Sequence, residues 1–269
     1  MIRLVACDLD ETLLDDDKRA GTANVEAIAK ARGAGVKFVL CTGRPFKDIR
    51  PTQKELGLYG MPGEYSINFN GGAIFENEGQ RLLHYEGITF EQAQALFEEG
   101  LKHDVCLQIY TLDHVYVWNL KEDEVRYTAG RMVTTPLPSA SIEFLRDVPI
   151  VKFLYQSEDM ELLHEIEEIT RPINQAMEVS YSSNRYLELN KKGVSKGQGL
   201  LWLADRLGIA RKETMAIGDN LNDLSMINEA GIGVGVANVV DAVRPACDVI
   251  TENDHNHGAV AEALNDYVL

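Results

Sequence analysis

Apolar and polar positions follow two different patterns along this chain, and the difference predicts two structural parts. In the first and last thirds, short continuous apolar runs end abruptly in polar residues, and segments with helical periodicity separate them. Such runs are typical of parallel strands that are buried on both faces. The predicted strands span 2–7, 36–41, 65–69, 214–217, 231–236 and 248–250, and the predicted helices span 22–32, 45–56, 195–207, 221–229 and 257–267.

The middle of the chain has strands that alternate between apolar and polar positions, which indicates one solvated face. These strands are predicted over 105–110, 115–119, 151–155, 178–181 and 186–189, with helices over 90–102 and 159–170. A short hairpin is predicted before them, from 73–76 and 81–84. We therefore expect an α/β fold in which residues 1–84 and 188–269 form a Rossmann-like parallel-sheet core. Residues 85–187 are expected to form an inserted α+β domain.

Composition narrows the range of partners. The 269 residues carry 26 basic against 42 acidic side chains, a formal charge of −16. Phosphate contacts supply most non-specific nucleic-acid affinity, so this charge argues against a nucleic-acid partner. No stretch approaches the roughly 20 apolar residues of a membrane span, and the N-terminus enters a core strand without a signal-peptide pattern. We expect neither nucleic acid nor membrane as a partner.

The four cysteines are not arranged as metal ligands or as paired thiols. Cys7 and Cys41 lie inside apolar strand patterns, and none of the four forms a CxxC pair. Buried free thiols are therefore expected. Free thiols are typical of a reducing compartment, which favours a cytoplasmic location.

Two acids at the end of the first predicted strand are the strongest chemical signal. Asp8 and Asp10 follow the apolar run directly. In open parallel sheets, ligands bind at the carboxyl ends of the strands. Two carboxylates at this edge can hold Mg²⁺, and one of them can attack phosphorus. The motif alone is weak, because many short strands end in Asp.

A second loop follows the second strand and carries groups that suit an oxyanion. Thr42 can donate its hydroxyl, and Gly43 can bring its backbone amide close to a ligand. The alternative at this stage is that Thr42 caps the helix that follows.

Two further loops complete the set. If Ser195 caps a helix, Lys196 lies in its first turn, where a cation opposes the helix dipole; this suggests a nearby anion, with a solvated lysine as the alternative. Asp219, Asn222 and Asp223 follow the strand 214–217 and suit a hard cation and a phosphate. The alternative there is helix capping by Asp219 or Asn220.

Together the four loops contain a nucleophile, a second acid, a hydroxyl, a lysine and a metal-binding pair. With these motifs the chain resembles the haloacid dehalogenase-like superfamily. It is most similar to the Cof-type sugar-phosphate phosphatases, which have a large α/β (C2-type) cap. The matching motifs are Asp8-Leu9-Asp10-Glu11-Thr12, Thr42-Gly43-Arg44, Asn70-Gly71, Lys196-Gly197 and Gly218-Asp219-Asn220-Leu221-Asn222-Asp223.

The resemblance implies a role for each motif residue. Asp8 would be the nucleophile and Asp10 the general acid and base, with Asp10 carrying a proton more easily because another acid lies near it. Mg²⁺ would be the cofactor. Its ligands would be Asp8, the backbone carbonyl of Asp10, Asp219 and Asp223. The phosphoryl oxygens would be bound by the amides of Leu9 and Gly43 and by Thr42, Lys196 and Asn222.

The chain departs from the family pattern at one position, and the sequence leaves the roles of several other residues open. Glu11 stands where the family usually has Gly; a positive φ there would cost about 1–2 kcal/mol. Arg44 is expected either to reach the substrate or to form a structural salt bridge. Candidates for reading the leaving group lie near Asn119, Tyr127, Arg131 and Ser182–Arg185, and each has a packing role as its alternative.

The function expected from the resemblance is a Mg²⁺-dependent phosphatase of small phosphorylated metabolites, with sugar phosphates as the first candidates, acting through an aspartyl-phosphate on Asp8. Two alternatives stay open. One is a phosphosugar mutase or other phosphotransferase, and the other is a non-catalytic protein that binds phosphometabolites. We expect a monomer or a weak homo-oligomer.

Overall fold

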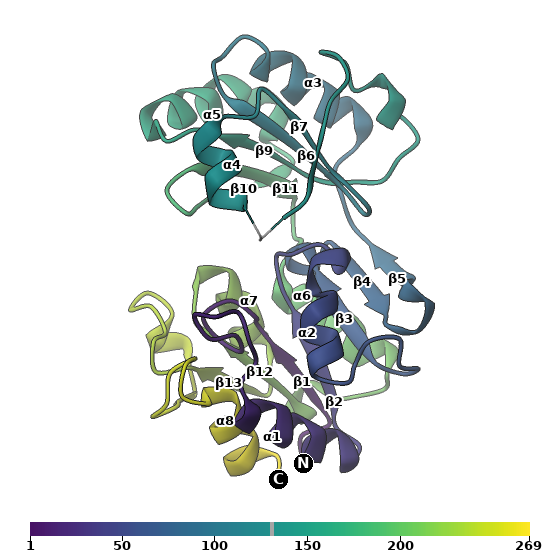
Figure 1. Ribbon diagram of the computed structural model, residues 1–269, viewed down its shortest axis with the longest axis vertical. Coiled ribbons are helices and arrows are strands. Elements are labelled where there is room, and N and C mark those ends of the chain that lie inside the picture. Colours follow the sequence, from purple (N-terminus) through teal and green to yellow (C-terminus); the bar gives the residue numbers. More distant parts are fainter. Residues whose placement is uncertain (130–131) are drawn as a thin grey trace. The chain divides into compact units, whose positions relative to one another are not determined.

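The computed structural model describes residues 1–129 and 132–269 (Figure 1). The chain divides into two compact units, one from Met1–Tyr85 and Ser195–Leu269 and the other from Glu86–Val194. No helix among the described residues is long and apolar enough to cross a membrane.

The first unit is built on an eight-stranded sheet with the order β14-β13-β12-β1-β2-β3-β4-β5. Six neighbouring strands are parallel, and the last two form an antiparallel hairpin at one edge. The parallel strands are β1 (Leu4–Cys7), β2 (Lys37–Cys41), β3 (Tyr65–Asn68), β12 (Thr214–Gly218), β13 (Ile232–Gly235) and β14 (Val249–Ile250); the hairpin strands are β4 (Ala73–Glu76) and β5 (Arg81–Tyr85). The predicted α/β core is therefore confirmed.

Helices cover both faces of this sheet, which explains the unbroken apolar runs. Val5 and Cys7 of β1 pack in one cluster with α1 (Thr22–Gly33) and α8 (Ala259–Tyr267). Leu4 and Ala6, which point the other way, pack with α6 (Lys196–Arg206) and α7 (Leu224–Glu229). The short α2 (Arg50–Glu55) completes the helices of this unit.

Two helices of the first unit are shorter than the pattern predicts. The segment 45–56 begins with a 3₁₀ turn over Phe46–Ile49, and the segment 221–229 begins with one over Leu221–Asp223. In the second case Asn220 and Asp223 accept backbone amides near the helix start. Such side chains compete with regular helical hydrogen bonds, which delays the α-helix by three residues.

The second unit contains a six-stranded sheet with the order β10-β11-β9-β6-β7-β8. Its strands are β6 (Cys106–Thr111), β7 (Val115–Trp118), β8 (Thr134–Pro136), β9 (Ile150–Gln156), β10 (Met177–Ser182) and β11 (Tyr186–Lys191). All pairs are antiparallel except β7 with β8. The helices α3 (Phe90–Gly100) and α5 (Met160–Asn174) share one apolar cluster with the sheet. Because β11 remains in this sheet, the chain returns to the first unit at Ser195, a few residues later than the expected 188.

The prediction that β6 and β9 each have a solvated face is wrong. Every residue of both strands is buried. Their polar side chains instead join a buried network: Gln108 donates to Glu124 at 2.7 Å, and Lys152 forms a 2.6 Å ion pair with Glu188. Glu124 belongs to α4 (Glu122–Thr128), a helix that the sequence pattern did not predict because it has only 7 residues and no side-chain cap.

A close approach between α6 and α7 sets the position of Lys196. Gly197 lies so near α7 that a Cβ atom added there would come within 2.5 Å of the Ser225 carbonyl oxygen. Backbone cannot move aside as cheaply as a flexible side chain, so only glycine fits at this crossing.

Replacing Gly197 with Ala is expected to lower the free energy of unfolding by about 1–3 kcal/mol, because the two helices must move apart. Chemical denaturation measures this change. Gly33→Ala is the matched control, since a Cβ at Gly33 meets no atom within 4 Å, and we expect a change there of no more than about 1 kcal/mol. Equal effects of the two substitutions would contradict the packing argument.

Candidate active site

Four loops meet at the carboxyl edge of the parallel strands, all within the first unit. Cys7 of β1 is in register with Leu40 of β2 and with Ile217 of β12, so these strands end side by side. Asp8 follows β1 and donates its amide to the Ile217 carbonyl at 2.9 Å. Thr42 and Asp219 follow the two neighbouring strands. The sheet therefore brings the predicted motifs together at the edge where parallel sheets bind ligands.

Lys196 lies at the centre of these loops and is fully buried. Its ammonium contacts Oδ1 of Asp8 and lies 2.6 Å from Oδ1 of Asp223. Ser195 caps the helix as expected, accepting the Gln198 amide at 3.2 Å. The alternative of a solvated lysine is thus wrong, and the anions suggested by its position in the first turn are these two carboxylates.

The charges at this centre do not balance. Burial raises the pKa of Asp8 well above its usual value, although Lys196 opposes the shift. Burial also raises the pKa of Asp219 to about 6. Burial alone would lower the pKa of Lys196, but the carboxylates of Asp223 and Asp8 outweigh it and raise that pKa above its ordinary value. Three buried acids thus share one ammonium, and a further cation at the site would stabilise the ionised carboxylates.

Asp219 and Asp223 are held rigidly. Thr12 donates its hydroxyl to Oδ1 of Asp219 at 2.6 Å. Oδ2 of Asp223 accepts the amides of Asp219 and Asn220 at 2.9 and 3.0 Å. Asn220, and not Asp219, caps the short turn that follows. One oxygen from each of Asp8, Asp219 and Asp223 lies within 4.8 Å of the others, an arrangement that suits a small hard cation.

The loop after β2 is ordered by its own side chains. The Thr42 hydroxyl accepts the Arg44 amide at 3.1 Å and does not cap the next helical turn, whose preceding residue is Pro45. Gly43 lies against Asn70, which adopts a positive φ of 55°. Asn222 donates to Oδ1 of Asn70 at 3.4 Å. Asn222 is therefore near Gly43, as a shared phosphate site requires. The side chain of Leu9 packs in the core, so only its backbone can serve a ligand.

Asp10 has different neighbours from those expected. Arg44 donates hydrogen bonds to both carboxylate oxygens of Asp10, with Nε 2.8 Å from Oδ2 and Nη2 2.5 Å from Oδ1. Lys18 lies 3.5 Å from Oδ1. Burial acts to raise the pKa of Asp10, but the hydrogen bonds and charges of Arg44 and Lys18 outweigh it and lower the pKa. The expectation that Asp10 carries a proton easily is wrong for this arrangement, because two cations surround it where an acid was expected.

Arg44 therefore takes the salt-bridge role that the sequence left open. The turn Thr42-Gly43-Arg44 placed this arginine beside the site. No sequence signal marked Lys18, which reaches Asp10 from a turn at positions 15–19, closed by an Asp15 amide to Arg19 carbonyl hydrogen bond of 2.9 Å.

The residues of the second unit that were candidates for reading the leaving group make contacts within that unit. Asn119 donates to Asp104 and to the Val105 carbonyl, each at 3.1 Å. Tyr127 donates to Ser183 at 3.0 Å, and Arg185 pairs with acids of α4. The expected candidate Arg131 lies outside the described residues.

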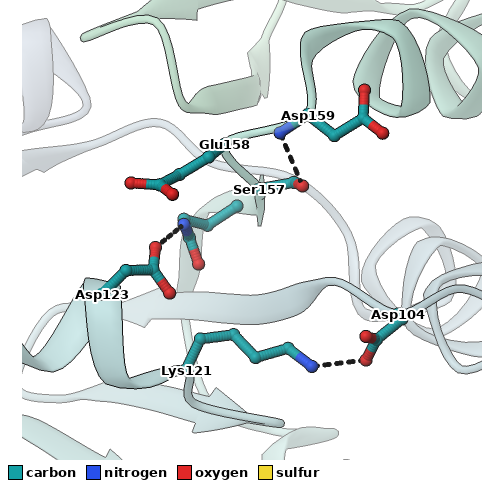
Figure 2. Close-up of a pocket in the computed structure, with 7 residues that line it drawn as sticks. Asp104, Lys121, Asp123, Ser157, Glu158 and Asp159 are labelled. Atoms are coloured by element: carbon teal, nitrogen blue, oxygen red, sulfur yellow. Dashed lines mark hydrogen bonds and ion pairs between the residues drawn. The ribbon is translucent and has the colours of Figure 1, made fainter.

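A pocket in the second unit, of about 140 Å³, has the wrong charge for a phosphate ester (Figure 2). Four carboxylates and a single lysine line it, from Asp104, Lys121, Asp123, Glu158 and Asp159. Figure 2 shows that Lys121 is already paired with Asp104. A phosphate would meet net repulsion there, which leaves the sheet edge of the first unit as the better phosphate site.

Comparisons with known proteins agree with this site. A family model described as haloacid dehalogenase-like hydrolase matches residues 5–264. The 5-amino-6-(5-phospho-D-ribitylamino)uracil phosphatase YcsE of Bacillus subtilis (strain 168) is 30% identical over 272 residues, covering 100% of this chain and 96% of the relative. The pyridoxal phosphate phosphatase YbhA of Escherichia coli (strain K12) is 27% identical over 277 residues and covers 99% of each chain.

A solved structure has the same fold. The crystal structure of a haloacid dehalogenase-like hydrolase from Bacteroides thetaiotaomicron is 29% identical, with a TM-score of 0.88 over 98% of this chain and 99% of that chain. The chain belongs to the haloacid dehalogenase-like hydrolase family and is a phosphatase of that family. The resemblance drawn from the motifs is confirmed.

Glu11 adopts the positive φ that glycine would favour, at 59°. Asn238 donates to the Glu11 carbonyl at 2.8 Å, which holds the backbone in this conformation. We expect Glu11→Gly to be more stable than Glu11→Ala by about 1 kcal/mol in chemical denaturation, since both remove the charge and only glycine relieves the strain. If the two variants were equally stable, the strain would not be significant.

The burial of Lys196 predicts a large effect of removing its charge. Lys196→Met leaves Asp8 and Asp223 without a cation, and we expect the free energy of unfolding to fall by about 3–5 kcal/mol near neutral pH. The deficit should shrink as the pH falls. Lys196 opposes the burial that raises the Asp8 pKa, so this pKa lies higher in the variant than in the wild type, and the folded variant takes up a proton more readily. Denaturation at about pH 7.5 and about pH 5.5 measures both effects, and a deficit that grew on acidification would contradict this account.

Proposed function

We propose that the protein is a Mg²⁺-dependent phosphatase that hydrolyses small phosphorylated metabolites, with sugar phosphates as the first candidates, through an aspartyl-phosphate on Asp8. The observation that carries the proposal is the buried Lys196 between Asp8 and Asp223 at the strand ends. A lysine in this position neutralises a nucleophilic carboxylate and offers charge to an incoming phosphate. The names of the two phosphatase relatives describe phosphate esters of small metabolites, which agrees with this class of substrate.

The residues at the site fit a divalent metal ion. Asp8, Asp219 and Asp223 supply clustered oxygen ligands. Burial raises the pKa values of Asp8 and Asp219, and a cation beside them would favour their ionised forms. Oxygen ligands of this kind favour Mg²⁺. We assign these three side chains and the Asp10 carbonyl to the metal. When bound, Mg²⁺ would neutralise charge on the phosphoryl group and on Asp8.

In the first proposed step, an Asp8 oxygen forms a bond to phosphorus while the bond between phosphorus and the ester oxygen breaks. Lys196 contacts Oδ1 of Asp8, which leaves Oδ2 as the attacking atom. The bonding electrons go to the ester oxygen. Asp10, once it has separated from Arg44 and Lys18 and taken up a proton, gives that proton to the ester oxygen, so the alcohol leaves neutral.

In the second step, water attacks the phosphorus of the aspartyl-phosphate. Asp10, now a carboxylate, takes the proton of the water, and the bond between phosphorus and Asp8 breaks to release inorganic phosphate. The charge on the phosphoryl oxygens is stabilised by fixed donors. We assign this role to the Thr42 hydroxyl, the amides of Leu9 and Gly43, and the side chains of Lys196 and Asn222.

The two alternatives differ from the phosphatase in what water does. A phosphosugar mutase would protect the aspartyl-phosphate from water and would need a bisphosphate for activation, whereas a binding protein would form no phosphoenzyme.

We also propose a cytoplasmic location, supported by the free cysteines, and a monomer or weak homo-oligomer.

Asp8→Asn is expected to abolish phosphate release from a panel of esters while the protein keeps its fold. The panel covers hexose and pentose phosphates, phosphoglycolate, pyridoxal phosphate, nucleotides and p-nitrophenyl phosphate, each assayed with Mg²⁺ and with EDTA. Wild-type activity should require Mg²⁺ and should fall by at least about 10⁴-fold in the variant, since no other carboxylate replaces the nucleophile. Near-normal hydrolysis by Asp8→Asn would disprove the assignment. Bisphosphate-dependent activity would instead favour the mutase.

A further inference from the structure

Two basic side chains from separate loops converge on one carboxylate at the mouth of the site. Arg44 and Lys18 both contact Asp10, and all three side chains reach solvent, with exposed fractions of 22%, 47% and 44%. This arrangement differs from Lys196, whose ammonium is enclosed. Arg44 and Lys18 are therefore accessible to a ligand that enters the site.

The backbone holds both cations in place. The Arg44 amide donates to the Thr42 hydroxyl at 3.1 Å, and the Arg44 carbonyl accepts the Asn68 side chain at 3.0 Å. Lys18 adopts a positive φ of 62° within its turn, an uncommon conformation for a lysine. Strained residues at functional sites persist when the surrounding structure supports them. These contacts and turns fix the backbone positions from which both side chains reach Asp10.

Both cations retain unused hydrogen-bonding capacity. Arg44 gives Nε and Nη2 to Asp10, and within the described parts of the chain Nη1 has no hydrogen-bond acceptor. Lys18 makes a single contact of 3.5 Å from an ammonium that has three donors. Two of the three acids that precede Lys18 have other partners: Asp15 accepts the Arg19 amide at 2.8 Å, and Asp16 pairs with His255 at 3.1 Å.

The proposed reaction requires Asp10 to separate from Arg44 and Lys18. To serve the ester oxygen, Asp10 needs an oxygen that is not held by Arg44 and Lys18, yet both of its oxygens are occupied. A substrate that lacks a second charge must break these charge-assisted bonds without replacing them. A substrate with a second anion can replace Asp10 as the partner of the two cations.

We propose that Arg44 and Lys18 bind a second anionic group of the substrate, in exchange for Asp10. The inference rests on the proposed phosphatase function and narrows its substrates to phosphate monoesters that carry a further carboxylate or phosphate. A chain of formal charge −16 attracts such dianionic or trianionic substrates only through local cations. Within the described residues, these two cations are the solvent-exposed ones that contact Asp10.

A matched pair of esters tests the proposal. sn-Glycerol 3-phosphate and 3-phosphoglycerate have the same kind of phosphate ester on a primary carbon, and the second has a carboxylate where the first has a hydroxymethyl group. We expect wild type to favour 3-phosphoglycerate in kcat/KM by about tenfold or more, since one retained charge-assisted interaction corresponds to at least that ratio.

The variants Arg44→Gln and Lys18→Gln should each reduce this preference, and the double variant should bring the ratio of kcat/KM values close to one. Arg44→Lys should restore part of it, because the charge returns without the fork of donors. Lys212→Gln is the control for net charge: Lys212 is exposed and precedes β12, at the end of the strand away from the site. We expect it to keep the wild-type ratio.

The result that would overturn the proposal is an equal loss of activity on both esters in Arg44→Gln, with the ratio unchanged; Arg44 would then only position Asp10. A wild-type ratio near one would overturn it as well. If neither ester were hydrolysed, the phosphatase function would be in question, and calorimetric binding of the two esters to wild type and to Arg44→Gln would still decide on the anion site. Tighter binding of 3-phosphoglycerate that Arg44→Gln abolishes would support the site, and equal binding would reject it.

Discussion

The burial of one lysine between two aspartates is the interaction on which the rest of the site depends. Lys196 has no exposed surface, and Asp8 and Asp223 supply its counter-charges. A buried ammonium is costly unless its hydrogen bonds and charge are matched. Asp223 meets this need with one oxygen and uses the other to hold the Asp219 and Asn220 amides. The Lys196 ammonium thus links its own helix to Asp8, 188 positions away in sequence, and to Asp223, 27 positions away.

The fold supplies the geometry that makes this contact possible. Parallel strands in register end at the same edge, so loops from both ends of the chain meet there. Gly197 allows α6 to lie against the backbone of α7, and the capping of α6 by Ser195 places Lys196 in its first turn. The acids and the lysine are therefore positioned by backbone, and the remaining charge imbalance explains why a cation would be stabilised there.

Much of the core could be predicted because continuous apolar runs and loop motifs are local signals. The parallel strands, the cap at Ser195 and the positive φ of Glu11 all follow from residues close in sequence. The partners of Asp10 could not be predicted, since Arg44 and Lys18 reach it from separate turns. The buried polar face of β6 and β9 was also missed, because Gln108 and Lys152 resemble solvent-facing residues until their partners Glu124 and Glu188 are placed. Long-range pairing decides these features, and periodicity does not report it.

The central claim is that Asp8 becomes phosphorylated during turnover, and the most direct test is to trap that intermediate. Wild type and Asp10→Asn would be mixed with p-nitrophenyl phosphate carrying labelled phosphate, because its leaving group departs without a proton from Asp10. The reactions would be quenched in acid within the first turnover and digested for peptide mapping. We predict label on the peptide that contains Asp8, with more of it in Asp10→Asn, because that variant cannot activate the water that removes the phosphoryl group. Continued release of phosphate with no label on Asp8, or label on another residue, would contradict the account.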